Sequence, residues 1–134
     1  MSEYDPRYER FVELFNAGEY YDSHDVLEDL WIEEGGEEKL YYQGLIQAAV
    51  GLLHHHHENL NGAIKLYTAA TEKLTRYAPV YLGLDVARLL AEIDRFHAMA
   101  RREKEDGVPG TLNPKPSLRF PLPAPAGPPE PRPD

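Results

Sequence analysis

The chain has 134 residues, no cysteine and a formal net charge of −9 at pH 7. The lack of cysteine excludes disulfides, thiolate catalysis and thiolate zinc sites. Residues 1–34 hold eleven acidic side chains against two basic ones, whereas binding to a nucleic-acid backbone needs clustered Lys and Arg. No apolar run approaches the ~20 residues that span a bilayer, and the N-terminus lacks the features of a secretion signal. We therefore expect a cytoplasmic protein that binds neither nucleic acid nor membrane.

The first helix is predicted from its end signals. Asp5 is a good N-cap, Pro6 suits the first helical position, and Gly18 ends the helix. The second helix is predicted over residues 21–34, where it stops at a pair of glycines.

Three further helices follow, over residues 37–57, residues 60–77 and from the cap Asp85 to about residue 104. Residues 44–53 of the third helix are apolar nearly all round, which indicates a central buried helix. We find no convincing strand. Because the predicted loops are short, consecutive helices should be antiparallel neighbours. The fold class is therefore all-α, a compact bundle of about five helices whose hairpins resemble repeat units only weakly.

The C-terminal part has a different composition. Residues 107–134 contain ten prolines, which favour extended polyproline conformation over helix. We therefore divide the chain into a helical bundle, residues 1–106, and an extended proline-rich tail, residues 107–134. Apolar side chains interrupt the prolines in residues 112–122, so we expect that segment to lie extended along a helical groove, on this subunit or on its dimer partner, and residues 126–134 to be loose.

The candidate site begins in the second helix. Residues at i, i+3, i+4 and i+7 share one face of a helix, so His24, Glu28 and Trp31 form one stripe with an intervening leucine. The apolar members of the stripe should point inward and carry the histidine and the carboxylate with them. Charged groups are seldom buried unless they are paired. This placement therefore needs a structural or a chemical reason.

The third helix offers a facing stripe. Gln43, Gln47 and His54 lie at i, i+4 and i+11, on one continuous helical face. His54 begins a run of four histidines, which point in different directions on a helix. We expect the other three, residues 55–57, to be exposed to solvent at the helix end.

These strings resemble the domain of unknown function 309 family of bacterial and archaeal proteins. The resemblance covers roughly residues 10–95, and its most specific part is His-x-x-x-Glu-x-x-Trp followed by Gln-Gly-Leu-Ile-Gln. It implies a compact helical bundle, often with paired subunits, and it implies no activity. The chain departs from the family at Asp25, where members commonly have Glu, in the extra histidines and in the long tail. The residues of the resemblance are Phe15–Tyr21, His24–Trp31, Gln43–Gln47, His54, Asn59, Gly62–Ala63 and Gly83–Val86.

Two classes of function follow. The first is a helical binding or scaffolding domain, most simply a homodimer that can also engage a protein partner, in which the polar stripes form a structural hydrogen-bond network. The second is a small-molecule or metal-dependent site, including a hydrolytic one, because helix bundles do build such sites from facing Glu and His. We expect no metal; if one binds, His24, Glu28 and His54 supply the usual three zinc ligands. The sequence identifies no cofactor and leaves open whether the protein is an enzyme. Convergence of the three side chains on one point would distinguish the two classes.

Overall fold

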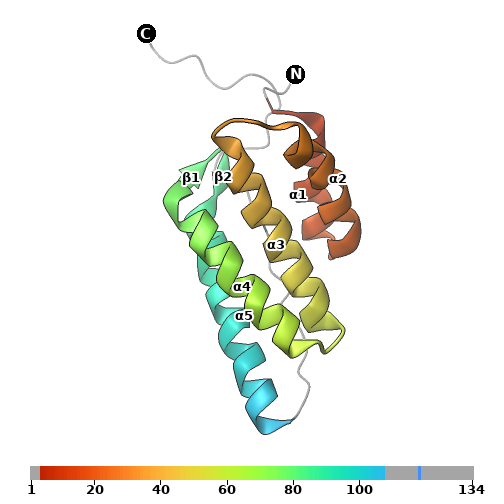
Figure 1. Ribbon diagram of the computed structural model, residues 1–134, viewed down its shortest axis with the longest axis vertical. Helices are drawn as coiled ribbons and strands as arrows, with labels where there is room; N and C mark the ends of the chain where they lie inside the picture. Colours follow the sequence, from red (N-terminus) through yellow and green to blue (C-terminus); the bar gives the residue numbers. More distant parts are fainter. Residues whose placement is uncertain (1–3, 108–117, 119–134) are drawn as a thin grey trace.

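A computed structural model of the chain describes residues 4–107 and Leu118 (Figure 1). Each helix bound lies within three residues of its predicted position. The described elements are α1 (Pro6–Asn16), α2 (Tyr20–Glu33), α3 (Glu38–His56), α4 (Leu60–Leu74), the 3-10 turn η1 (Thr75–Tyr77), β1 (Val80–Tyr81), β2 (Leu84–Asp85) and α5 (Val86–Asp106).

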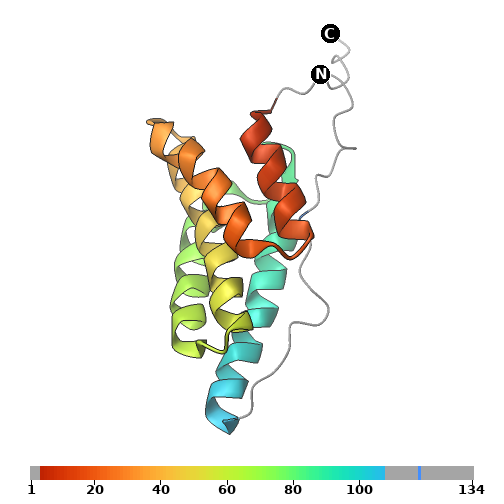
Figure 2. The ribbon, with the colours of Figure 1, turned by 90° about the vertical axis from the view of Figure 1, so that its right-hand side faces the viewer.

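The helices form two layers. Helices α2, α3 and α4 lie side by side in one layer, and α1 and α5 cover its back (Figures 1 and 2). Consecutive helices pack against one another, with the most extensive contact between α3 and α4. The predicted all-α bundle of antiparallel neighbours is therefore confirmed. None of the helices in the described part of the chain is both long and apolar enough to cross a membrane.

Local signals in the sequence set the helix ends. The Asp5 carboxylate accepts the backbone N–H of Arg7, with proline at the first helical position. The Asp85 carboxylate caps α5 in the same way, by accepting the N–H of Arg88. Gly107 ends α5 at φ 70°, a left-handed conformation that glycine adopts without steric cost.

The prediction that the chain contains no strand is wrong in one place. Strands β1 and β2 form an antiparallel hairpin in which Val80 pairs with Asp85. Leu82 and Gly83 connect them, and both have positive φ, 45° and 76°, as tight two-residue hairpin turns require. The hairpin connects α4, in the front layer, to α5, in the back layer.

Tyrosine hydroxyl groups connect the hairpin to the helices. The hydroxyls of Tyr8 and Tyr41 lie 2.7 Å apart, and each is also within hydrogen-bond distance of a carbonyl, that of Leu82 (3.0 Å) for Tyr8 and that of Tyr81 (3.2 Å) for Tyr41. The two hydroxyl protons are shared among these three contacts. Burial raises the pKa of both phenols well above the ordinary value. This network therefore holds α1, α3 and the hairpin together with neutral groups, which avoids the cost of a buried charge.

One residue of the tail belongs to the core. Leu118 is 2% exposed, and its backbone N–H and C=O bond to the side-chain amide of Asn16 on α1. This contact concerns Leu118 alone, and the predicted docking of residues 112–122 stays a prediction. The other residues of that segment, and residues 126–134, lie outside the described residues.

Candidate functional site

The α2 stripe lies at the edge of the core rather than inside it. His24, Glu28 and Trp31 are each half-buried, whereas the neighbouring Leu27 is fully buried. The His24 ring nitrogen Nδ1 donates to the carbonyl of Tyr21, one turn earlier, at 2.6 Å. His24 therefore bonds within its own helix and not to Glu28.

Trp31 contacts the start of α3. The ammonium group of Lys39 lies 4.5 Å from the centre of the indole ring, a cation–π contact, and donates to the Trp31 carbonyl at 2.9 Å. The indole Nε1 is buried and has no hydrogen-bond partner. A buried donor without a partner costs about 1–3 kcal/mol. The hydrogen-bonding capacity at this edge of the core is therefore not fully used.

The α3 stripe also lies at the edge of the core. Gln43, Gln47 and His54 are half-exposed, and His54 Nδ1 lies 3.4 Å from the amide nitrogen of Asn59. The Gln47 oxygen Oε1 is buried without a partner. The middle of α3 is buried at Gly44, Leu45, Ala48, Ala49, Gly51 and Leu52, as expected of a central helix, and is partly exposed at Ile46, Gln47, Val50 and Leu53.

The predicted three-ligand set does not form. No three His, Cys, Asp or Glu side chains in residues 4–107 and 118 are grouped so that they could hold a metal ion, and His24, Glu28 and His54 all lie within that range. The stripes of α2 and α3 border the same face of the bundle, but the structure supplies no metal centre from them.

The histidine that enters the core is His55, which was predicted to be exposed. It is 3% exposed, and its Nδ1 lies 2.8 Å from the hydroxyl of Tyr67 on α4. Its Nε2 lies 3.0 Å from Oε1 of Glu103 on α5, which is 8% exposed. A polar network of three helices therefore crosses the core where α3, α4 and α5 meet.

The position of His55 follows from the phase of α3. Gly44, Gly51 and His55 lie at i, i+7 and i+11, on the face that packs against α4. A Cβ on Gly44 would lie 2.8 Å from Leu74, and one on Gly51 would lie 3.1 Å from Tyr67. The two glycines mark the side of closest helix approach, and this signal would have assigned the inward position to His55 instead of His54.

Several polar atoms in and near this network have no hydrogen-bond partner. Glu103 Oε2 is buried and has no hydrogen-bond partner, and the same holds for His97 Nε2 and the Tyr20 hydroxyl. The ring of His97 lies 6.1 Å from that of Tyr67, and burial lowers its pKa below the ordinary value. Buried polar atoms without partners therefore occur on both α5 residues of this region, Glu103 and His97.

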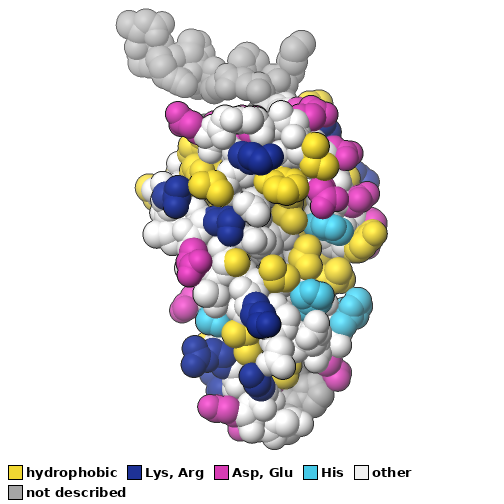
Figure 3. All heavy atoms as spheres, in the orientation of Figure 1, with side chains coloured by type: hydrophobic (Ala, Val, Ile, Leu, Met, Phe, Trp, Pro, Cys, Tyr) yellow, Lys and Arg dark blue, Asp and Glu magenta, His cyan; other side chains and the backbone are white. Residues whose placement is uncertain are grey.

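The outward side of α3 has a second notable property, its lack of charge. We define the α3 face as Gln43, Ile46, Gln47, Val50 and Leu53, which are all half-exposed. Between Lys39 and His54 the helix contains no Asp, Glu, Lys, Arg or His, although charged residues make up 28% of the chain. Figure 3 shows this side of the molecule, with hydrophobic side chains gathered over its middle.

The described part of the chain is a small bundle of helical hairpins in which the central helix α3 carries no charge between Lys39 and His54. The sequence profile of the family described as Domain of unknown function (DUF309) matches residues 8–66, from α1 into α4. The resemblance seen in the sequence is therefore confirmed over this part of the chain.

One relative is "Uncharacterized protein YpuF" of Bacillus subtilis (strain 168), which is 38% identical over 82 residues. The match covers 59% of this chain and 47% of the relative, so the chain spans about half the length of the curated relative. Neither description names a ligand or a reaction.

Proposed function

We propose that the protein is a homodimeric helical binding domain and that the α3 face is its dimer interface. The observation that carries this proposal is the uncharged, half-exposed surface of a central helix in a strongly charged chain. The cores of protein interfaces are depleted of charged residues relative to other surfaces. Ile46 and Leu53 of this face also pack against the core, but a helix that only faced solvent would have little need of Val50 beside them.

A second copy of the chain fits this face better than a different partner does. A two-fold interface pairs a surface with itself. A side chain near the two-fold axis therefore packs against the same side chain of the other subunit, and the two must be compatible. The amide side chains of Gln43 and Gln47 carry both donors and an acceptor, and aliphatic side chains pack on their like. The face is therefore self-complementary, and its pairing buries no unpaired charge.

The surroundings of the face also favour symmetric pairing. Exposed apolar side chains also occur at the start of α3, where Leu40 is 37% exposed, and on the neighbouring α2, where Ile32 is 64% exposed. The acidic side chains of α2 lie beside the face and not within it. In a dimer centred on Val50, these acidic groups would remain at the solvated rim, where like-charge repulsion is screened.

The test is the mass of the full chain in solution, measured by light scattering after size exclusion. We expect twice the 15.3 kDa chain mass. Val50→Lys places two ammonium groups opposite each other in the interface, which costs several kcal/mol, so the dimer should dissociate about a hundredfold more readily or more. Val80→Lys is the matched control, because Val80 is 50% exposed on β1, away from the face.

The variants must retain their helical circular dichroism for the comparison to count. A wild-type chain that is monomeric at high micromolar concentration contradicts the proposal. Equal dimer stability in the two lysine variants would instead show that the chain pairs through another surface.

A further inference from the structure

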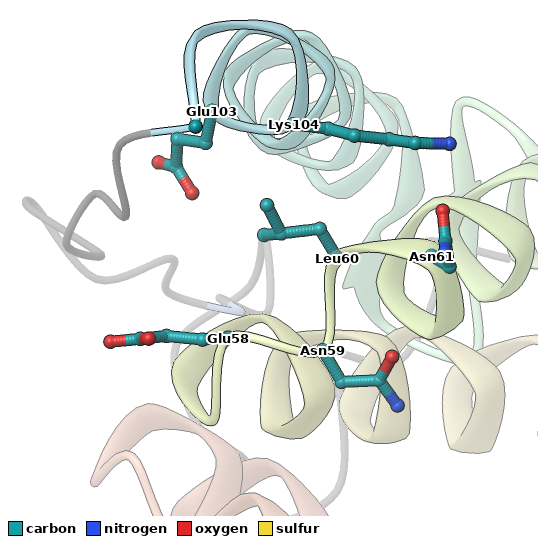
Figure 4. A pocket seen from close by; sticks show the side chains of 7 residues that line it. Glu58, Asn59, Leu60, Asn61, Glu103 and Lys104 are labelled. Atoms are coloured by element: carbon teal, nitrogen blue, oxygen red, sulfur yellow. The ribbon is translucent and has the colours of Figure 1, made fainter.

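A cleft opens at the end of the bundle, away from the α3 face. It has a volume of about 340 Å³, a size at which small-molecule sites begin. It lies between the last turns of α5 and the turn that joins α3 to α4 (Figure 4). The described residues that line it are Glu58, Asn59, Leu60, Asn61, Glu103, Lys104 and Gly107.

Glu103 gives the cleft its chemical character. Its side chain is 9% exposed, and only one of its two oxygens is used, since Oε1 bonds to His55 at 3.0 Å while Oε2 has no partner. Figure 4 shows the carboxylate pointing from α5 into the gap above the α3–α4 turn. A buried carboxylate oxygen without a donor is costly, and a ligand that supplies a donor would remove that cost.

The other lining groups specify the kind of donor. Lys104 extends along α5 away from Glu103, whereas Leu60 reaches into the gap and Glu58 borders it from the turn (Figure 4). Two carboxylates and an aliphatic side chain therefore line the space together with Lys104, whose ammonium group points away from Glu103 (Figure 4). Such a lining suits a positive charge carried on a short apolar stem.

We propose that this cleft binds a small organic cation, an alkyl primary ammonium ion, whose charged head donates to Oε2 of Glu103 while its stem packs on Leu60. A divalent metal is a poorer occupant, because calcium takes six to eight oxygen ligands and no group of three acidic or histidine side chains in the described part of the chain could hold a metal. His55 acts as a positioning residue, since its bond to Oε1 fixes the carboxylate and leaves Oε2 directed at the ligand.

The experiment is an amide NMR titration of the full chain with n-butylammonium chloride. Sodium chloride at equal ionic strength controls for screening, and n-butanol controls for the apolar stem. We expect saturable shifts of amides in the cleft, at Leu60, Asn61 and Gly107, with butylammonium alone. Absence of saturable shifts at these amides would overturn the proposal.

Three single substitutions locate the charge that is recognised. Glu103→Gln keeps the shape and the bond to His55 but removes the charge-assisted hydrogen bond, and should weaken binding about tenfold or more. Glu58→Gln, at an exposed position, should weaken it severalfold, and it decides the matter if Glu103→Gln fails to fold. Glu105→Gln is the matched control on α5, since Glu105 is exposed and does not line the cleft. Equal affinity in Glu103→Gln and Glu105→Gln would refute recognition by Glu103.

Discussion

Substituting Gly44 with alanine tests how closely α3 and α4 approach each other. In an exposed helix this change stabilises by about 1 kcal/mol, because alanine has the higher helix propensity. Here the added Cβ would lie 2.8 Å from Cγ and 2.9 Å from Cδ2 of Leu74, and 3.2 Å from Cβ of Lys73. Leu74 is 0% exposed, so its side chain cannot move aside into solvent.

The clash should exceed the gain in propensity. Overpacking a well-packed core costs typically ~1–3 kcal/mol, and contacts below 3.0 Å to a buried branched side chain belong in the upper half of that range. Subtracting the propensity term leaves a net loss of about 1–2 kcal/mol for Gly44→Ala. Gly51→Ala should lose less, because its nearest neighbours, the ring carbons of Tyr67, lie at 3.1 Å.

Urea denaturation followed by circular dichroism measures the free energy of unfolding of each variant. Gly35→Ala is the control, because a Cβ at Gly35 meets nothing within 4 Å, and its stability should stay within about 0.5 kcal/mol of the wild type. A Gly44→Ala protein as stable as the wild type, with an unchanged denaturant slope, would refute the close-approach reasoning.

Three other predictions concern stability. Leu118→Ala should cost about 2–5 kcal/mol, measured as a shift in the denaturant midpoint, and an unchanged midpoint would show that the tail residue is not part of the core. Tyr67→Phe removes the hydroxyl from His55 and should cost about 1–3 kcal/mol; a neutral result in the same assay would mean that this buried bond contributes nothing net. The hydrogen bond from Arg7 lowers the pKa of Asp5 below 3.8, so its contribution is full above that value and is lost as the pH falls further. Asp5→Asn should therefore flatten the decline of stability below about pH 4, and an identical acid profile between pH 2 and 5 would contradict this.

The helices could be predicted from the sequence because their end signals are local. Asp5, Gly18 and Asp85 each act on backbone groups within a few residues, and each lies at a helix boundary in the structure. The hairpin could not be predicted in this way. Strands of two residues show no alternation of polar and apolar side chains, and the pairing of Val80 with Asp85 depends on how the turn is held by tyrosines from distant helices.

The candidate site was harder to predict because it depends on helix phase. The polar stripe containing His54 was expected to face the interior, but its members are only partly buried, and the direction of α3 is hard to assign because the helix is apolar on nearly every side. The next residue, His55, lies on the same side of α3 as Gly44 and Gly51, and this side packs against α4. His55 therefore enters the core. Its partner Glu103 lies 48 residues away in sequence, on a helix whose acidic end looks like ordinary solvated surface, so no local pattern connects the two.

The order in which the helices pack has a consequence for how the protein folds. The principal helix contacts of the described residues join elements that follow one another along the chain, and such local topologies fold quickly. Each hairpin can form soon after its own residues are synthesised, without waiting for a distant segment. The bond from the Tyr8 hydroxyl to the Leu82 carbonyl is different, because it joins residues 74 positions apart. We expect such long-range contacts, which include that of Asn16 with Leu118, 102 positions apart, to close only after the consecutive helices have paired.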